Sequence, residues 1–540
     1  MYLLSVLLSL YGFVAEATTL LSRASSSLPP DVENVCHLIL SKYPSFLVWD
    51  PTGPWGFRTA SQASMYNEAV TSYLSVASIS QRPACILFPS NAAQVSYAVR
   101  LLNSHPGVRF GLKSGGHNGN LGFSTAPGGL LIAFRPNSRF AVPAPNGRSV
   151  LVGAGCKWKD VYEVLQPLGK AAVGARFDDV GVTGYILGGG LSYLSAQYGF
   201  ACDNVLSFKC VLANGTIVTA SRKSHPDLYF ALRGGGNQFA IVTSMRLRTH
   251  HVGRRGLIWG GMRIYAATQH DALLDAIAKF TAEGNDPKAA IFPVFGFGTD
   301  KQANFPLTIV VYFYDGLKPS SVFDGFDRIP SLFSDTGPTA FRKLHEQLDG
   351  GNIQGIHVAH RMNSFPNMPP AVMSDFLREH YTKLQTYADT ASTVKLIEMK
   401  VFSFDAQPIH HTIAQASKRI GGGNALNLDP SHGDRLWIAY YLAWTNSSCD
   451  EACPKFLQSV SNAMRKFHKE HYAGVLPTHY AQGDLDFLSY NPIYMNHAMH
   501  DQKVLQSYGN ATYQRLKAIH AAYDPHGLFS QRQGGFHFTD

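Results

Sequence analysis

The chain has 540 residues, of which 45% are hydrophobic and 15% charged. At about 150 residues per domain, this length predicts two to four folding units. The 49 glycines and 29 prolines are spread along the chain, which excludes a low-complexity or fibrous protein. Although the formal net charge is +9, Lys and Arg are scattered, so we expect no nucleic-acid partner.

The N-terminus carries an apolar stretch, residues 3–14, followed by Ala15-Glu16-Ala17. This pattern predicts a secretory signal peptide over residues 1–17 and therefore a secreted protein. The stretch is too short to cross a bilayer, and no later segment has about eighteen uninterrupted apolar residues, so we expect no membrane association. Glycosylation on this route would use the sequons at Asn214, Asn446 and Asn510.

The seven cysteines are an odd number, so at least one thiol stays free or pairs between chains in an oxidising compartment. Cys449 and Cys453 have no second Cys or His pair close in sequence, and the histidines show no HExxH spacing. We therefore expect no metal site.

The clearest local unit spans residues 84–114. An apolar strand is followed by Ser90 as a candidate helix N-cap, by apolar residues at helical spacing, and by a second strand. This order predicts a βαβ unit. The next elements are predicted as strands at 130–134 and 149–155, a helix at 157–168 and a hairpin at 205–219.

After about residue 255 the pattern changes to longer strands and amphipathic helices with few glycine loops. The strands lack βαβ punctuation, which favours an α+β domain with a mainly antiparallel sheet and helices on one side. The clearest of these elements are strands at 306–314 and 435–444 and helices at 271–283 and 450–471. The last fifty residues return to the glycine-rich and aromatic character of the first half.

Three glycine clusters occur, at residues 114–118, 181–190 and 233–237. Glycine lets the backbone take positive φ and approach an anion closely, so that several N–H groups can converge on a phosphate. None of the clusters fits GxGxxG or GxxxxGK[ST], so neither a Rossmann nor a nucleotide-hydrolase loop is supported. Taken singly, each is also compatible with an ordinary tight turn.

The order of these motifs resembles the FAD-binding domain of the vanillyl-alcohol oxidase superfamily, in its berberine-bridge-enzyme-like branch. The resemblance covers residues 83–248. It rests on ACILFPSNAAQV, SGGHNGN, VGVTGYILGGGLSYLSAQYGFACDNVLSFKCVLANG and PDLYFALRGGGNQFAIVT, in that order. The C-terminal YDPHGLFSQRQGGFHF, with Tyr494-Met495-Asn496 upstream, is similar to the closing segment of fungal members.

The resemblance implies an α+β fold with a PCMH-type FAD-binding domain of two subdomains. This domain would span residues 18–255, with its characteristic part at about 78–250. A substrate domain would follow at 256–485, where the chain resembles the family only in length and in the general pattern of strands and helices. Residues 486–540 would return to the FAD-binding domain.

The resemblance also implies the flavin attachment. In this family the His of the GGH motif carries an 8α-histidyl bond, and His117 stands at that place; the alternative is a loop histidine with an ordinary hydrogen bond. Phe177 stands where many members have a second, cysteinyl link, so we expect one covalent bond. Residues 236–242 should line the adenine or ring side. The expected cofactor-binding residues are Ser114, Gly115, Gly116, His117, Asn118, Val180, Gly181, Gly184, Gly188, Gly189, Gly190, Val242 and Asn496.

Tyr494, in the family's Tyr-x-Asn element, is the first candidate for a catalytic group that helps remove a substrate proton. A buried structural tyrosine is the alternative. Because a phenol has a pKa of about 10, it needs a positive neighbour or the field of the flavin to act as a base near neutral pH, and Lys400 is a possible neighbour.

The implied reaction is hydride transfer to FAD from a C–H bond next to O or N, with reoxidation by dioxygen to give hydrogen peroxide. In this family a small residue at the position of Val180 leaves room for dioxygen over the flavin ring, so the valine favours an oxidase over a dehydrogenase. The expected substrate is a small alcohol, alkaloid or polyketide-like metabolite, oxidised with or without ring closure. The alternatives are a carbohydrate oxidase and a secreted binding protein without flavin. We expect a monomer.

The resemblance further implies a disulfide between Cys36 and Cys85. Three further cysteines lie in apolar segments, and we expect them to be buried, unreactive thiols: Cys156, Cys202 and Cys210.

Overall fold

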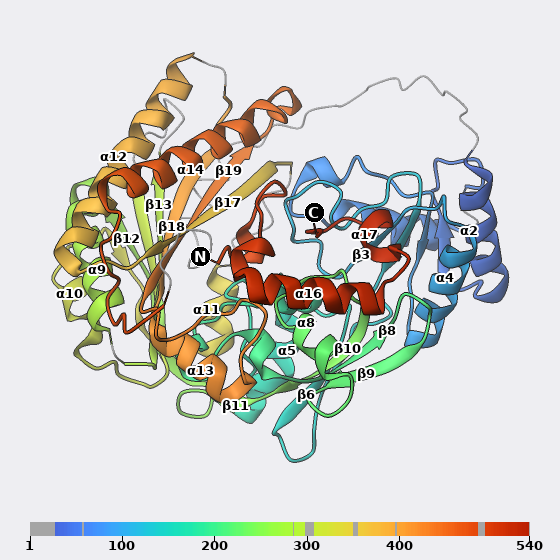
Figure 1. Ribbon diagram of the computed structural model, residues 1–540, viewed down its shortest axis with the longest axis horizontal. Coiled ribbons are helices and arrows are strands. Elements are labelled where there is room, and N and C mark those ends of the chain that lie inside the picture. Colours follow the sequence, from blue (N-terminus) through green and yellow to red (C-terminus); the bar gives the residue numbers. More distant parts are fainter. Residues whose placement is uncertain are drawn as a thin grey trace.

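The computed structural model describes residues 28–56, 59–284, 286–297, 307–348, 355–394, 397–483 and 492–538. The expected signal peptide, residues 1–17, lies outside them. Among the described helices none is both long and apolar enough to cross a membrane. The described chain builds three larger sheets, which Figure 1 shows as two groups of elements, with the third sheet and its helices on the left.

The first sheet has four strands in the order β1-β2-β4-β3. Strands β2, β4 and β3 are parallel, as a βαβ unit requires, and α4 connects β2 to β3. The N-cap of α4 is Asn91 rather than Ser90, because the Asn91 side chain accepts hydrogen bonds from two N–H groups of the first turn. The bounds are β1 Leu47–Trp49, β2 Cys85–Leu87, α4 Ala92–Ser104, β3 Phe110–Lys113 and β4 Leu130–Ala133.

A disulfide ties the leading helix to this sheet. Cys36 in α2 (Pro30–Lys42) and Cys85 in β2 form the expected pair, with an S–S distance of 2.02 Å. Cys449 and Cys453, whose pairing the sequence left open, form a second disulfide. The free, buried cysteines among the described residues are Cys156, Cys202 and Cys210.

The second sheet is antiparallel, with five strands in the order β5-β6-β10-β8-β9. Its β8–β9 hairpin turns at Asn214-Gly215, where Gly215 has a φ of +82°. The bounds are β5 Ala141–Pro143, β6 Ser149–Gly153, β8 Val205–Val211, β9 Ile217–Ser221 and β10 Ile241–Arg248. The helices beside it include α5 Trp158–Leu165, α6 Val182–Leu187 and α8 Pro226–Ala231.

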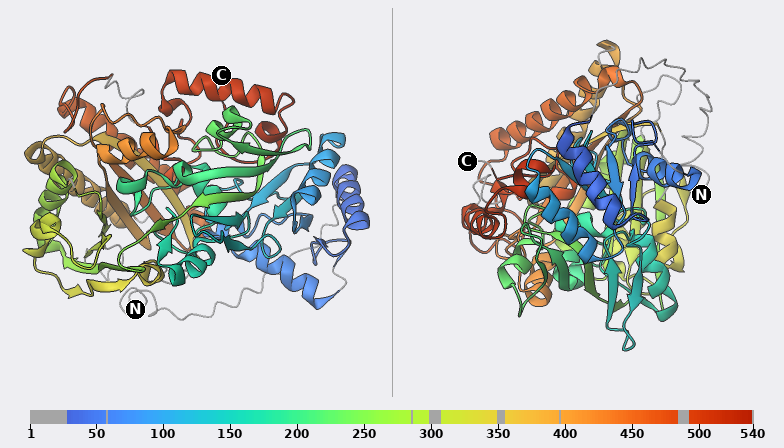
Figure 2. Two further views of the ribbon diagram at one scale, coloured as in Figure 1. Left: turned by 90° about the horizontal axis from the view of Figure 1, so that it is seen from below. Right: turned by 90° about the vertical axis from the view of Figure 1, so that its right-hand side faces the viewer.

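The C-terminal segment returns to these first two sheets. Helix α16 (Asn510–Tyr523) packs on α8, and both views of Figure 2 show the red C-terminal helices against the green elements. In α17 (Leu528–Arg532), the Arg532 guanidinium donates to the backbone carbonyls of Leu102, His105 and Val108. The chain end is therefore fixed to α4 and the loop after it.

The third sheet is antiparallel with eight strands, and β16 pairs with β12 beside the main path β15-β12-β14-β13-β18-β19-β17. Its strands are β12 Leu257–Ala266, β13 Ala289–Phe297, β14 Leu307–Tyr314, β15 Phe333–Ser334, β16 Gly337–Ala340, β17 His357–Pro366, β18 Val401–Ile409 and β19 Arg435–Trp444. All lie inside the segment 256–485. Helices α9 (His270–Glu283), α12 (Pro370–Val394) and α14 (Ala452–His471) cover one face (Figure 1).

Side chains of β18 alternate between the two faces of this sheet. Phe404 is fully buried in the core beneath the helices, whereas its neighbours Ser403 and Asp405 line a cavity on the other face. In that core, the Phe404 ring stacks on Phe295 with centroids 4.8 Å apart. The strand period of two thus directs alternate side chains of β18 to the hydrophobic core and to the cavity.

Replacing Phe404 with Ala should lower the free energy of unfolding by about 3–5 kcal/mol, because it removes a fully buried ring and leaves a cavity. Denaturant unfolding followed by circular dichroism measures the change. The matched control is Phe333→Ala, an exposed phenylalanine of the same sheet, which should stay close to wild type. Equal effects at both positions would contradict the assignment of Phe404 to the core.

Candidate active site

A cavity of about 1470 Å³ lies between the glycine loops of the first two sheets and the open face of the third. Most of the residues expected to bind the cofactor line it. These are Ser114, Gly115, Gly116, His117, Asn118, Val180, Gly181, Gly184, Gly188, Val242 and Asn496, and the expected catalytic residue Tyr494 lines the cavity as well.

The two main glycine loops touch each other at Gly115 and Gly181. A Cβ atom added to either glycine would lie 2.4 Å from the backbone nitrogen of the other. No larger residue fits at either position without moving the backbone. Ser114 fixes the same corner, since its hydroxyl donates to the Ala154 carbonyl at 2.7 Å. The contact between Gly115 and Gly181 joins the loop that carries His117 to the N-terminal end of α6.

The end of α6 is held by Asn496 of the C-terminal segment. A Cβ on Gly188 would lie 2.0 Å from the Asn496 side-chain oxygen, so glycine is required for this approach. The Asn496 amide donates to the Tyr185 carbonyl at 3.0 Å and to the Tyr494 hydroxyl at 2.9 Å. Gly184, in the middle of α6, has no atom within 4 Å of an added Cβ and faces the open cavity.

Gly189 and Gly190 do not line the cavity, contrary to expectation. Their φ angles are +100° and +84°, and an added Cβ would collide with Leu426 at Gly189 and with Tyr185 at Gly190. These two glycines therefore form a tight turn that packs against neighbouring side chains.

Tyr494 is buried at the cavity wall, where its ring stacks on Trp437 with centroids 4.8 Å apart. Its hydroxyl accepts hydrogen bonds from the Leu191 N–H and the Asn496 amide, both at 2.9 Å. Burial raises the pKa of Tyr494 above its usual value, although the Asn496 hydrogen bond and the Arg176 charge oppose this. The phenol is therefore well placed to hydrogen-bond a ligand but poorly suited to lose its proton.

The cation near Tyr494 is Arg176 and not Lys400, which had been the candidate. Lys400 also lines the cavity, but its side chain is half-exposed and lies 3.7 Å from Glu398. The Arg176 guanidinium is buried, lies 3.9 Å from the centre of the Phe292 ring and donates to Gln407.

Asp405 of β18 is a site residue that the sequence reasoning missed. Its carboxyl group lines the cavity, and burial raises its pKa to about 7 while Arg176 opposes the rise. The sequence feature that could have indicated it is the single carboxylate within the otherwise largely apolar strand VFSFDAQPI. A group with this pKa can accept and release a proton near neutral pH.

Two further histidines, His360 of β17 and His497, line the cavity with His117. The rings of His360 and His497 have centroids 6.2 Å apart. Burial, with a contribution from His117, lowers the pKa of His360 to about 4, and burial also lowers the pKa of His497. Both are neutral at pH 7, so each ring nitrogen without a proton can accept a hydrogen bond.

Residues 83–221 match the model of an FAD-binding domain family. Among curated proteins, the chain is 30% identical to an uncharacterized FAD-linked oxidoreductase of Arthroderma benhamiae over 87% of this chain and 90% of the relative. It is 32% identical to the FAD-dependent monooxygenase FUP4 of Fusarium proliferatum over 87% of both chains.

Solved structures share the fold. The chain is similar to 6-hydroxy-D-nicotine oxidase of Arthrobacter nicotinovorans with a TM-score of 0.65 and 19% identity, covering 96% of this chain and 99% of that one. Berberine bridge enzyme of Eschscholzia californica gives 0.66 and 17%, covering 94% and 99%. The motif order, the antiparallel third sheet and these relatives agree: the chain belongs to the FAD-linked oxidoreductases and has the fold of berberine bridge enzyme.

Proposed function

We propose that this oxidoreductase binds FAD covalently through His117 and oxidises a C–H bond next to O or N of a small metabolite, with dioxygen as the final acceptor and hydrogen peroxide as a product. The observation that carries the proposal is the convergence on one cavity of His117, Asp405 and Tyr494, which come from three distant segments.

The cavity fits FAD together with a substrate. Pockets for one drug-sized ligand measure about 300–1,000 Å³, and this one measures about 1470 Å³. Gly184 leaves open the space that a Cβ would fill, as a cofactor cradle requires. Residues 114–118, Gly181 and Gly184 would hold the pyrophosphate and ribityl parts, with Val242 and Asn496 nearer the ring. When bound, FAD accepts the hydride and passes the electrons to dioxygen.

His117 is the proposed attachment residue, as the resemblance implies. The neutral rings of His360 and His497 line the same cavity, so either could accept the proton that the His117 ring gives up on attachment. The second proton would come from the flavin methyl group, and the two electrons would leave through the flavin to dioxygen. Phe177 packs edge-on against Phe292, with centroids 6.0 Å apart, and offers no second attachment atom. We therefore propose a single covalent link.

Asp405 is the proposed general base, in place of Tyr494. A carboxylate with a pKa of about 7 can take the proton from a substrate hydroxyl or amine at neutral pH. Tyr494 then orients the substrate, because its hydroxyl already accepts two hydrogen bonds and keeps its own proton to donate. Val180 lines the cavity and, being small, leaves room for dioxygen.

The substrate we propose is a small alkaloid-like or polyketide-like molecule rather than a sugar. The third sheet presents mainly apolar side chains to the cavity, which suits an aromatic or aliphatic ligand better than a polyhydroxylated one. These apolar residues are Met262, Phe292, Val294, Ile309 and Val311.

We also propose that the protein is a secreted, glycosylated monomer. Two disulfides fit an oxidising compartment. The three sequon asparagines are exposed, as glycosylation requires: Asn214, Asn446 and Asn510.

A peroxide-coupled screen of alcohols, amines and sugars identifies the substrate and tests the oxidase assignment. One peroxide per oxygen consumed supports an oxidase. Oxygen consumption without peroxide, with an oxygen atom in the product, would instead support a monooxygenase such as the relatives are named.

With that substrate, Asp405→Asn should slow anaerobic flavin reduction by about 10²–10⁴-fold. In the wild type, the rate should rise as the pH rises through about 7, because the base must lose its proton. The rise should disappear in Asp405→Asn and remain in Tyr494→Phe. Stopped-flow absorbance measures both, and an unchanged pH profile in Asp405→Asn would exclude Asp405 as the base.

His117→Ala should release the flavin. The wild-type protein should stay yellow after acid precipitation, whereas the variant should leave its colour in the supernatant because no covalent bond retains it. Phe177→Leu, which removes no attachment atom, serves as the control. Colour retained in the His117→Ala pellet would show another attachment residue.

Gly184→Ala tests the cradle. Alanine suits a helix better than glycine by about 1 kcal/mol, and the added Cβ meets no protein atom, so the unfolding temperature of the flavin-free protein should not fall. The Cβ should nevertheless lower the FAD content per chain, measured by absorbance. Gly337→Ala, equally unobstructed but away from the cavity, is the control. Full FAD content in Gly184→Ala would place the cofactor elsewhere.

A further inference from the structure

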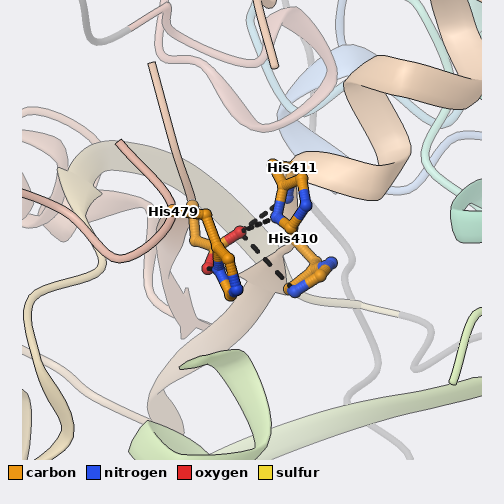
Figure 3. A group of neighbouring side chains, drawn as sticks. His410, His411 and His479 are labelled. Atoms are coloured by element: carbon orange, nitrogen blue, oxygen red, sulfur yellow. Dashed lines mark hydrogen bonds and ion pairs between the residues drawn. The ribbon is translucent and has the colours of Figure 1, made fainter. Parts of the chain in front are cut away.

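A cluster of four side chains lies at the edge of the third sheet, outside the cavity. His410, His411, Asp434 and His479 each offer one ligand atom, and these atoms all lie within 4.8 Å of one another. Figure 3 shows the three imidazole rings around the carboxylate, which belongs to Asp434. Three histidines and one carboxylate form a donor set that suits zinc.

The sheet topology brings these residues together. Ile409 at the end of β18 pairs with Arg435 at the start of β19, so His410 and Asp434 flank the same register position. His411 begins helix α13 (His411–Gly421). The loop of His479 is fixed independently, because the Asp434 N–H donates to the Thr478 carbonyl at 2.8 Å.

The ligand atoms lie near the spacing of a four-coordinate site. From Asp434, one carboxylate oxygen lies 2.9 Å from Nδ1 of His411 and 3.7 Å from Nε2 of His410, and the other lies 2.7 Å from Nδ1 of His479. With zinc bonds of about 2.0–2.1 Å, neighbouring tetrahedral ligands lie about 3.3 Å apart. Small side-chain movements would bring all four atoms to that spacing.

Charge and hydrogen bonding also favour a cation. The Asp434 side chain is fully buried, and a cation held beside it would offset the cost of burying the carboxylate. His410 is only 8% exposed, and its Nε2 atom has no hydrogen-bond partner among the described residues. Its Nδ1 atom accepts a hydrogen bond from the Thr412 N–H at 3.4 Å and lies 2.9 Å from the Thr412 hydroxyl, and these contacts orient the ring with Nε2 toward the cluster.

The carboxylate is held in place by groups that are not ligands. The His411 backbone N–H and the Thr478 hydroxyl donate to its two oxygens, each at 2.7 Å. Such outer contacts orient the first ligands of a metal site. His479 has a φ of +57°, uncommon for a residue other than glycine, and in this conformation its ring meets Asp434.

We propose that His410, His411, Asp434 and His479 bind one zinc ion in a closed, structural site. With four protein ligands no position stays open for a substrate, so the metal would fix the junction of β18, β19 and the 479 loop. The earlier expectation of no metal rested on sequence spacing, but the ligands here are separated by 23 and 45 residues. The proposal does not depend on the flavin chemistry.

Zinc binding to the purified full-length holoprotein tests this proposal. After treatment with EDTA and dialysis against buffered zinc, the wild type should retain one zinc per chain by mass spectrometry. Zinc should also raise its unfolding temperature by mass action. Asp434→Asn and His479→Gln should weaken zinc binding by more than about 100-fold and lose the thermal shift.

His471→Gln, an exposed histidine of α14 outside the cluster, should bind zinc like the wild type. Circular dichroism checks folding. If Asp434→Asn does not fold, His479→Gln decides, since its side chain is 37% exposed. Cobalt in place of zinc should give the strong visible absorption of a four-coordinate ion. Less than about a tenth of an equivalent of zinc in the wild type, or unchanged zinc affinity in His479→Gln, would overturn the proposal.

Discussion

The contact between Gly115 and Gly181 is the constraint on which the cavity depends. Because neither residue has a Cβ, two loops from different sheets approach to a separation that would place an added Cβ 2.4 Å from the opposite backbone. This approach places the loop that carries His117 against the N-terminal end of α6, and both His117 and Gly184 of α6 line the cavity. A side chain at either glycine would force the loops apart and open this wall of the cavity.

The opposite wall depends on the strand period of two. In β18 the same alternation buries Phe404 beneath the helices and presents Asp405 to the cavity, and a slip of one residue would exchange the two. Electrostatics then sets the chemistry. Burial raises the pKa of Asp405 to about 7, and Arg176 keeps the rise from being larger. The register of β18 in the sheet therefore fixes both the buried position of Phe404 and the position of Asp405, the proposed base, at the cavity.

Sequence reasoning predicted features that depend on local order. The βαβ unit, the antiparallel third sheet and the family of the FAD-binding domain all follow from periodicity or from motifs in a specific order. It did not predict features that depend on tertiary contact. The pKa of Asp405 is raised by burial, which the sequence does not reveal. The cation that acts on Tyr494 is Arg176 rather than Lys400 because of how the chain packs. Gly189 forms a tight turn, although its motif suggests a contact with the cofactor. The ligands of the proposed zinc site come together through strand pairing between β18 and β19, which no spacing rule reveals.

The central claim is that this cavity holds FAD bonded to His117. The most direct measurement is mass spectrometry of the peptide that contains residues 114–118, after proteolysis of denatured wild-type protein. We expect this peptide to carry the added mass of FAD and fragmentation to place the addition on the histidine. An unmodified peptide, with all of the flavin recovered free or on another peptide, would contradict the account.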